Sequence, residues 1–264
     1  MNKLRDYEIY TSRMRKSIYD KMFFVDKIFD ENIDTLIDFG CADGELILHL
    51  HAFMPNVRFI GYDTSEVMLE KAKDRIPFAE LYSNWDDIEV DPSRTIINLS
   101  SVIHEIYSYC TQAEIKEFWD RILNTGFAYI VVRDMCKVNY ECDITALQQW
   151  RKKVTDAGYG KELSDFEKYW GPIKNNNQKT HFLLKYRYAE NWDRELRENY
   201  MPLTAYELKW RLVGYETMYY DFKPLPFIVD QIGKDLDIDM SLVPTHFYGI
   251  FKKKEKTDEN INCN

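Results

Sequence analysis

Short apolar runs alternate with amphipathic stretches through the first third of the chain. The runs at 36–39 and 57–63 are rich in apolar residues and stop at a turn or an acid, whereas Ile47, Leu48 and Leu50 between them have helical spacing. Apolar runs of this length that end in tight turns are typical of buried parallel strands. The pattern therefore predicts a strand, a helix and a second parallel strand, which together form one βαβ unit.

Similar patterns extend this unit into a larger α/β sheet. Further strands are predicted at 78–83, at 95–101 with its continuation through 102–106, at 128–132 and, as an antiparallel pair, at 215–222 and 245–251. Helices are predicted within 1–31, capped by Thr11 or Ser12, and at 64–72, 112–123, 145–158, 163–170, 181–200 and 204–212, with a loop at 175–178. We expect a single domain over 1–264 that ends in a flexible tail at 252–264.

The turn after the first predicted strand favours a ligand that carries a nucleoside. Gly40 and Gly44 can adopt backbone angles closed to other residues, and the helix that follows directs unpaired N–H groups at the turn. Asp63 ends the second strand, where a carboxylate can accept hydrogen bonds from both hydroxyls of a ribose. The dinucleotide fingerprint G-x-G-x-x-G is absent, and Asp43 and Glu45 lie in the turn, where they are expected to repel a pyrophosphate.

The pattern D-x-G-C-x-x-G at 38–44, followed by G-Y-D-T-S-E-V-M-L-E-K-A at 61–72, resembles the first two motifs of class I methyltransferases that depend on S-adenosylmethionine. This resemblance covers 34–135, about half of the chain. It implies a Rossmann-like seven-stranded sheet, mostly parallel with an antiparallel last strand, with an N-terminal helix and a helical insert after the fifth strand. The alternative is a chance match within another α/β protein. The family often has Gly where this chain has Ala42.

The resemblance also implies the cofactor, S-adenosylmethionine, whose sulfonium and amino groups attract carboxylates. In the family the first acid lies near the methionine part, the glycine turn packs against it and the second acid holds the ribose. Asn84 and Trp85 are expected at the adenine, although a loop Trp also packs on a core. The cofactor residues that the resemblance implies are Asp38, Gly40, Cys41, Ala42, Gly44, Asp63, Thr64, Met68, Asn84, Trp85, Ser100 and Ser101. Tyr7, Tyr10, Arg13 and Lys21 of the N-terminal segment are candidates to reach the methionine carboxylate, and the alternative is that most of them form a solvated face.

His104 is the candidate general base. The resemblance places it with Ser100 and Ser101 at the carboxyl end of the fourth strand, beside the methyl group to be transferred, and imidazole titrates near neutrality. Asp134 follows the fifth strand and is expected to orient a substrate amine or hydroxyl. The alternatives are a packing role for His104 and a structural salt link for Asp134.

The segment 137–201 interrupts the methyltransferase pattern and is predicted to form a helical lid that recognises the substrate. Between Arg151 and Glu198 it has eleven Lys or Arg and eight Asp or Glu, whereas the whole chain has a formal charge of −9. Its substrate candidates are His181, Lys185, Arg187 and Tyr188, which mix positive charge with rings as an anionic aromatic or nucleotide-like substrate requires. A helical cap or a dimerisation surface is the alternative.

Composition limits the remaining classes. The chain is 45% hydrophobic, contains no apolar run of the roughly 20 residues that span a bilayer, and starts without a secretory signal, so we expect a cytoplasmic protein that does not bind membranes. The five cysteines lack a C-x-x-C pair and predict neither a disulfide framework nor a metal site; Cys136 and Cys142 are the closest pair. The oligomeric state stays open.

The sequence therefore predicts methyl transfer from S-adenosylmethionine to an oxygen or nitrogen acceptor. A small molecule is the first choice of acceptor, because the surface is acidic and the lid compact, and RNA or a protein follows. A cofactor-binding regulatory or interaction subunit without catalysis is a further alternative. A nicotinamide-dependent dehydrogenase is disfavoured by the two acids in the turn.

Overall fold

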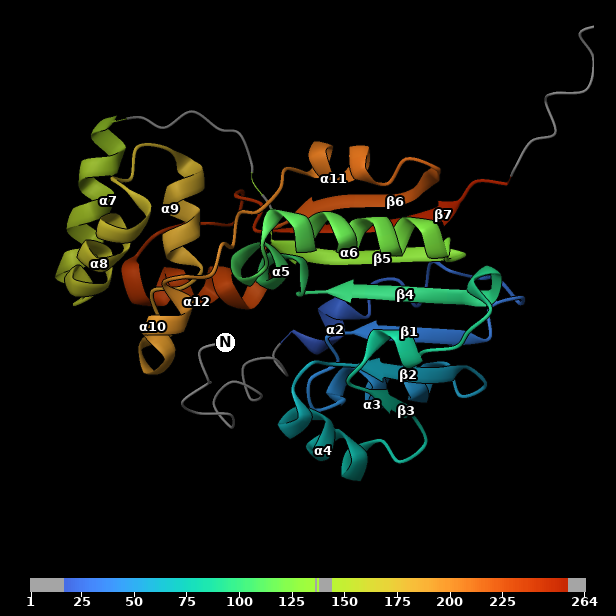
Figure 1. The fold of residues 1–264 in the computed structure, drawn as a ribbon. Coiled ribbons are helices and arrows are strands. Elements are labelled where there is room, and N and C mark those ends of the chain that lie inside the picture. The colour runs from blue at the N-terminus through green and yellow to red at the C-terminus, as the bar shows by residue number, and fades with distance from the viewer. Residues whose placement is uncertain (1–16, 136, 138–143, 256–264) are drawn as a thin grey trace, which may run out of the picture.

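The computed structural model describes residues 17–135, 137 and 144–255. They form a seven-stranded sheet with the order β3-β2-β1-β4-β5-β7-β6 (Figure 1). β7 is antiparallel to both of its neighbours and the other pairings are parallel, which confirms the predicted sheet. The strands are β1 (Thr35–Phe39), β2 (Arg58–Tyr62), β3 (Glu80–Tyr82), β4 (Thr95–Ser100), β5 (Tyr129–Met135), β6 (Tyr215–Lys223) and β7 (His246–Lys253).

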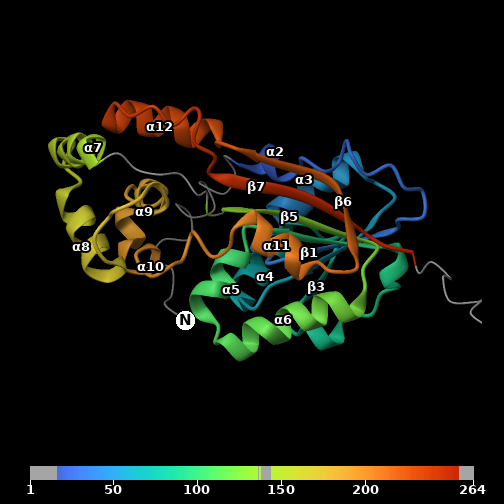
Figure 2. The ribbon, with the colours of Figure 1, turned by 90° about the horizontal axis from the view of Figure 1, so that it is seen from above.

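Helices cover both faces of the sheet (Figure 2). One face carries α2 (Ile18–Lys21), α3 (Glu45–Phe53) and α4 (Glu66–Arg75), and the other carries α5 (Ile103–Tyr109), α6 (Gln112–Thr125) and α11 (Ala205–Arg211). α6 shows why the sequence folds in this way. A capping box of Thr111 and Glu114 starts it, Ile115, Trp119 and Ile122 are buried on its inner face, and Gly126 ends it in a left-handed conformation.

A helical subdomain lies beyond the carboxyl ends of the parallel strands (Figure 1). It contains α7 (Ile144–Asp156), α8 (Gly160–Trp170), α9 (Asn176–Leu183), the 3₁₀ helix η3 (Ala189–Asn191) and α10 (Trp192–Glu195). α12 (Pro226–Leu236), which connects β6 to β7, joins it through Ile232 and Leu236, and these pack with Trp150, Phe166 and Phe182 in a core separate from that of the sheet. We had expected only a hairpin between β6 and β7, so α12 was missed.

Several predicted elements were wrong in extent. The fourth strand ends at Ser100, and the segment 102–106 enters α5 instead of continuing the strand. The predicted helix at 181–200 is broken after Leu183, and the predicted loop at 175–178 is the start of α9, where the Asn175 side chain accepts a hydrogen bond from the Gln178 N–H. β7 reaches Lys253, two residues into the predicted tail.

The N-terminal helix is also shorter in the described residues than we expected. α2 spans four residues, and Phe29, which lies within the predicted range 1–31, is outside α2 and 86% exposed. The predictions for Tyr7, Tyr10, Thr11, Ser12, Arg13, Cys136, Cys142 and most of the tail lie outside the described residues.

Candidate functional site

A cavity of about 1070 Å³, its open mouth included, lies between the carboxyl edge of the sheet and the helical subdomain. α2, the turn after β1, the ends of β2, β4 and β5, and α5 contribute its walls on the sheet side. Residues 184–200 and the start of α12 contribute the opposite wall. The cavity therefore lies where ligands of open α/β sheets bind.

The turn after β1 is closely constrained. Gly40 and Gly44 have φ angles of +82° and +77°, and a Cβ added at Gly44 would lie 2.5 Å from the Ile76 Cδ1. Ala42 also has a positive φ of +48°, which is uncommon outside glycine. Its N–H donates to Asp63 Oδ2 at 2.9 Å, and this bond holds the turn against the end of β2.

Asp63 is thereby fixed at the cavity wall. Its other oxygen, Oδ1, accepts the Ser65 N–H at 2.8 Å, and burial raises the pKa of its carboxyl. A carboxylate oxygen can accept more than one hydrogen bond, so each oxygen can still accept a ligand hydroxyl. The geometry is compatible with the predicted ribose contact.

The two acids in the turn do not act as free charges. Asp43 forms an ion pair with Arg75, and Glu45 Oε2 lies 3.1 Å from the same guanidinium. One guanidinium offsets only one of the two carboxylate charges, so the expected repulsion of a pyrophosphate by this turn is weakened and stays a prediction. Arg75 ends α4, 32 residues after Asp43, so the local pattern gave no sign of this pairing.

Asp38 and Lys21 lie behind the turn and are both buried. Asp38 Oδ1 accepts a hydrogen bond from Asn98 Nδ2 at 2.8 Å, and burial raises the pKa of Asp38 to about 6. Burial, reinforced by the nearby Arg133 charge, lowers the pKa of Lys21 to about 8. Lys21 is only 5% exposed and lines the cavity, and no described residue accepts a hydrogen bond from its ammonium group.

The structure brings most of the predicted cofactor residues together. Gly40, Ala42, Asp63, Ser100 and Ser101 line the cavity, and Asp38 and Cys41 line a small recess beside it. Gly44 packs behind the turn against Ile76.

Four predicted cofactor residues do not line this cavity: Thr64, Met68, Asn84 and Trp85. Met68 is buried in α4, and Asn84 caps the 3₁₀ helix η1 (Trp85–Asp87), where its side chain bonds to the Asp86 N–H and the Asp87 carboxylate. The Trp85 ring lies 5.1 Å from the Phe39 ring and 5.3 Å from the Tyr62 ring. This packing corresponds to the alternative we kept for Trp85, because aromatic rings nearby offer it apolar contact.

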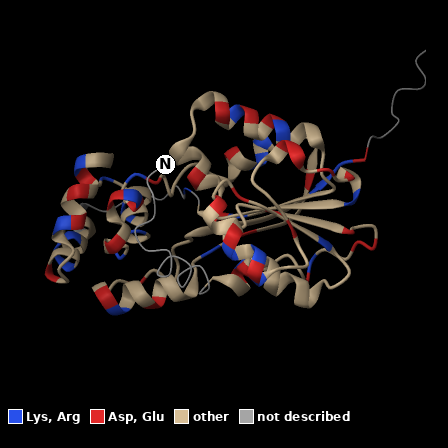
Figure 3. Ribbon diagram, turned by 60° about the horizontal axis from the view of Figure 1, so that its bottom comes forward, with Lys and Arg blue, Asp and Glu red and all other residues tan. Residues whose placement is uncertain are grey.

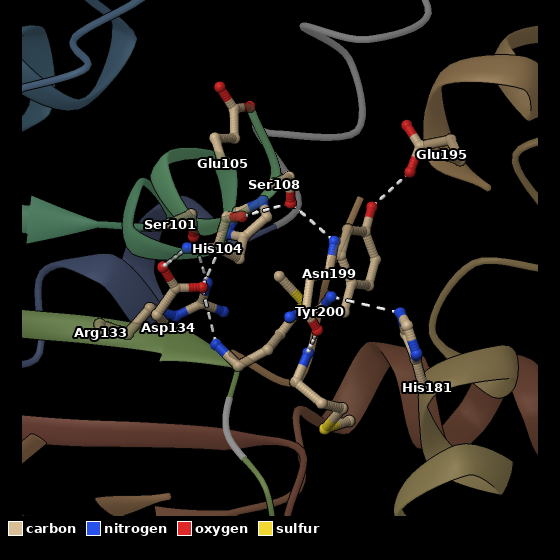
Figure 4. Close-up of polar contacts among 12 residues, drawn as sticks. Ser101, His104, Glu105, Ser108, Arg133, Asp134, His181, Glu195, Asn199 and Tyr200 are labelled. Atoms are coloured by element: carbon tan, nitrogen blue, oxygen red, sulfur yellow. Dashed lines mark hydrogen bonds and ion pairs between the residues drawn. The ribbon is translucent and has the colours of Figure 1, made fainter. Parts of the chain in front are cut away.

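His104 and Asp134 form a buried pair at the cavity (Figure 4). His104 Nδ1 lies 2.8 Å from Asp134 Oδ1, and the His104 backbone N–H donates to Asp134 Oδ2 at 3.1 Å. Burial opposes the charged ring, but the charge and hydrogen bond of Asp134, together with the charges of Glu198 and Glu105, outweigh burial and raise the pKa of His104 to about 9. Despite its own burial, Asp134 has a lowered pKa because of His104.

This pair changes the role of Asp134. Oδ1 also accepts the Met135 N–H at 2.7 Å, and Asp134, unlike Asp63, does not line the cavity. Asp134 is therefore placed to orient His104, and our expectation that it orients a substrate group is not supported. The expectation also assumed that Arg133 and Asp134 follow β5, whereas β5 continues to Met135.

Hydrogen bonds and ion pairs join α5 to the opposite wall. The Asn199 N–H donates to Ser108 Oγ at 2.6 Å (Figure 4), and the Tyr109 hydroxyl donates to Glu198 Oε1 at 3.0 Å. Arg194 lies between two acids, with Nη2 2.8 Å from Glu105 Oε1 and Nε 2.8 Å from Glu198 Oε1. These contacts hold the subdomain over His104.

The predicted substrate residues mostly lie elsewhere. His181 is buried with its ring 5.1 Å from that of Phe166, and burial holds its pKa well below the usual range. Lys185 is fully buried and donates to the Glu198 carbonyl, and Arg187 Nε lies 3.2 Å from Asp235 Oδ2. Tyr188 lines the cavity. His181, Lys185 and Arg187, which we predicted to recognise the substrate, do not line the cavity, because the fold turns the first two inward and pairs the third with Asp235.

The cavity wall contains Glu195, Glu198 and Tyr200, which were not among the candidate residues predicted from the sequence. A spacing of three residues places Glu195 and Glu198 on one side of a helical turn, and this was the available signal. Within the described residues, no three His, Cys, Asp or Glu side chains are arranged to hold a metal ion. No helix in the same part of the chain has the length and apolar character to cross a membrane.

No protein-family model matches the sequence, and no curated protein matches it. Solved structures do resemble the fold. The methyltransferase domain of bacterial CtHen1 has a TM-score of 0.51 and 14% identity, over 91% of this chain and 100% of that one. The plantazolicin methyltransferase BamL, solved with a triazolic desmethylPZN analogue and SAH, has a TM-score of 0.53 and 14% identity, over 94% and 88%. A proposed S-adenosylmethionine-dependent methyltransferase from Listeria monocytogenes has a TM-score of 0.50 and 15% identity, over 91% and 100%.

These likenesses cover nearly the whole chain, although at such low identity they concern the fold alone. Together with the strand order and the antiparallel β7, they show that the chain has the class I methyltransferase fold.

Proposed function

We propose that the protein transfers a methyl group from S-adenosylmethionine to an oxygen or nitrogen atom of a small molecule. The observation that carries this proposal is the cavity, which joins the constrained turn and Asp63 at one side to the His104–Asp134 pair at another. The resemblance in the sequence and the solved methyltransferase structures support the same activity.

The residues of the sheet edge fit the cofactor. Asp63 is placed for the ribose hydroxyls, and the buried ammonium group of Lys21 is suited to the carboxylate of the methionine part, which would supply the partner it lacks among the described residues. When bound, S-adenosylmethionine supplies an electrophilic methyl group, which the acceptor lone pair takes as the methyl–sulfur bond breaks.

His104 is suited to remove the proton of the acceptor. Asp134 occupies Nδ1 and leaves Nε2 for a substrate, and the neutral ring accepts the proton there. A pKa of about 9 keeps most of the ring protonated at neutral pH, and a nearby sulfonium favours its neutral form. We therefore expect methyl transfer to become faster as the pH rises towards 9.

A small acceptor is favoured over RNA because the basic residues of the subdomain are largely paired. Arg151 binds Glu167, Lys153 binds Asp237, and the remaining pairs include Lys152–Asp156, Lys161–Asp165 and Arg187–Asp235. In the view of Figure 3, blue and red segments alternate along the described helices of the subdomain. RNA binding depends mainly on Lys and Arg that are free to neutralise phosphates.

Calorimetry with S-adenosylmethionine and S-adenosylhomocysteine tests the cofactor, and release of labelled methyl groups onto cell-extract fractions tests turnover. His104→Gln should bind the cofactor as the wild type does and lose most turnover, whereas His49→Gln on α3 should keep both. Binding without turnover on any fraction would favour the non-catalytic subunit. If a fluorescence titration shows that the protein binds the reduced nicotinamide cofactor, this result would favour the dehydrogenase.

A further inference from the structure

The wall of the cavity contributed by the helical subdomain is acidic, although the subdomain sequence has more basic than acidic residues. From this wall we propose that the methyl acceptor carries a cationic nitrogen group, an ammonium or guanidinium, that binds Glu195 and Glu198. The inference rests on the proposed methyl transfer and adds the chemical class of its acceptor.

Glu195 has one oxygen that accepts a hydrogen bond and one without a donor among the described residues. Its side chain lines the cavity and the residue is 5% exposed. Oε2 accepts the hydroxyl hydrogen of Tyr200 (Figure 4), whereas no described residue donates to Oε1. Oε1 is therefore open to a hydrogen bond from a ligand in the cavity, and a charged donor forms the stronger hydrogen bond with a carboxylate.

The charged side chains that the subdomain contributes to the cavity lining are acidic. Glu195 and Glu198 come from the subdomain, and Glu105 faces them from α5, with Arg194 shared between Glu105 and Glu198. Two further cations lie near them: Lys185, whose pKa burial lowers to about 7, and His104, which is paired with Asp134. Burial raises the pKa of all three carboxyls, and a cationic ligand would favour their charged forms.

The positive groups of the cavity lie on its sheet side. Lys21 comes from α2, and Arg133 comes from β5, where its guanidinium binds Asp20 at 2.8 Å and Ser101 Oγ at 2.7 Å. In Figure 4, Arg133 and Glu195 lie on opposite sides of His104. The cavity thus offers a cation near its cofactor side and carboxylates near its subdomain side.

The same geometry sets how far the cationic group lies from the reacting atom. The ring of Tyr200 lies 5.3 Å from the ring of His104, and its hydroxyl is bonded to Glu195. The carboxylate of Glu195 is therefore separated from the ring of His104 by about the length of one tyrosine side chain. An acceptor that fits has a hydroxyl or amine at His104 and, a short spacer away, the cation at Glu195.

In the reaction this acceptor forms a bond from its oxygen or nitrogen to the methyl carbon as the methyl–sulfur bond breaks. The sulfur takes the bonding electron pair and leaves as S-adenosylhomocysteine, and the proton of the acceptor group passes to His104 Nε2. The cationic group at Glu195 is unchanged, because its role is to position the acceptor.

The test measures binding of small probes to the protein loaded with S-adenosylhomocysteine, by calorimetry. Tyramine, agmatine and spermidine are the cationic probes, and 4-ethylphenol and phloretate are the neutral and anionic matches of tyramine. We expect tyramine to bind at least about tenfold more tightly than its two matches, and Glu195→Gln to remove at least about tenfold of its affinity, a factor that corresponds to about 1.4 kcal/mol. Asp193→Asn is the matched control, because it removes one negative charge from an exposed position of the same helix and should leave this affinity unchanged.

Each other outcome has a defined meaning. Tighter binding of phloretate, no binding of any cationic probe, or equal tyramine binding by Glu195→Gln overturns the inference while leaving methyl transfer intact. Glu195→Gln should bind S-adenosylhomocysteine as tightly as the wild type, and this binding shows that the variant is folded. If Glu195→Gln does not fold, Glu198→Gln is used in its place. If the wild type fails to bind S-adenosylhomocysteine, the proposed function itself fails.

Discussion

Replacing Asp134 by Asn tests the pair that we assign to proton removal. In the wild type the pKa of His104 is raised from 6.5 to about 9, against the effect of burial, chiefly because of Asp134, with smaller contributions from the charges of Glu198 and Glu105. Since one pKa unit corresponds to about 1.4 kcal/mol, the carboxylate and its partners stabilise the charged ring by about 3 kcal/mol in the folded protein. Asn keeps the shape of the side chain but removes the charge, so burial then dominates and the pKa of His104 should fall to about 6.5 or lower.

The pH dependence of stability follows from the same shift. Because the folded pKa of His104 lies above the unfolded one, its contribution is complete below pH 6.5 and is lost as the pH rises through about 9. The pKa of Asp134 is lowered, so its contribution is present above pH 3.8 and is lost as the pH falls through the lowered value. Asp134→Asn should therefore cost about 3 kcal/mol of unfolding free energy at pH 6 and much less at pH 10.

The measurement is a pH titration of the histidine rings by NMR, with the His104 signal assigned from its absence in His104→Gln. Denaturant unfolding at pH 6 and pH 10 gives the stability difference. Asp120→Asn, which removes a partly exposed carboxylate on α6, is the control and should leave the His104 titration unchanged. A wild-type ring that titrates at 6.5, or the same pKa in Asp134→Asn, would refute the reasoning.

Three further predictions concern the turn and the cofactor side. Gly44→Ala should lower the free energy of unfolding by about 2 kcal/mol or more, because the position has a φ of +77° and the new methyl group meets Ile76; an unchanged denaturation midpoint would contradict this. Asp63→Ala should weaken S-adenosylhomocysteine binding by about 2 kcal/mol or more, with Asp63→Asn as the milder control, and an unchanged dissociation constant would remove the ribose assignment. Lys21→Met should stabilise the free protein at pH 7 by about 1–3 kcal/mol, since the pKa of Lys21 is lowered to about 8 and its buried charge opposes folding below that pH. The same variant should weaken binding of S-adenosylmethionine in calorimetry, and tighter binding would exclude Lys21 as the carboxylate partner.

The sheet and its turn could be predicted because their signals are local. A strand buried on both faces needs consecutive apolar residues, and Leu36 and Ile37 are fully buried as this pattern indicates. A sharp turn with positive φ angles needs glycine, and Gly40 and Gly44 both adopt them. The sequence therefore predicted the position of the cofactor side of the cavity.

The partners of these residues could not be predicted, because they come from distant parts of the chain. Arg75 forms its ion pairs with Asp43 and Glu45 only once α4 packs beside the turn. Asp134 reaches His104 because β4 and β5 are neighbours and α5 begins directly after β4. Local spacing indicates neither contact, and each one changes the chemistry expected of the residues involved.

The helical subdomain shows a second reason why parts of the site could not be predicted. Charged residues in a sequence are assumed to be exposed, because most of them are. His181, Lys185, Glu195 and Glu198 are each at most 5% exposed, so helical spacing of apolar residues could not find this interior. Burying such groups is unfavourable unless they bind one another, and Lys185 with the Glu198 carbonyl and Glu195 with Tyr200 do so. Glu195 Oε1 lies at the cavity without a donor among the described residues. Because the groups around it are paired and this acceptor is open to the cavity, Oε1 is the position at which we propose that the cationic group of the methyl acceptor binds.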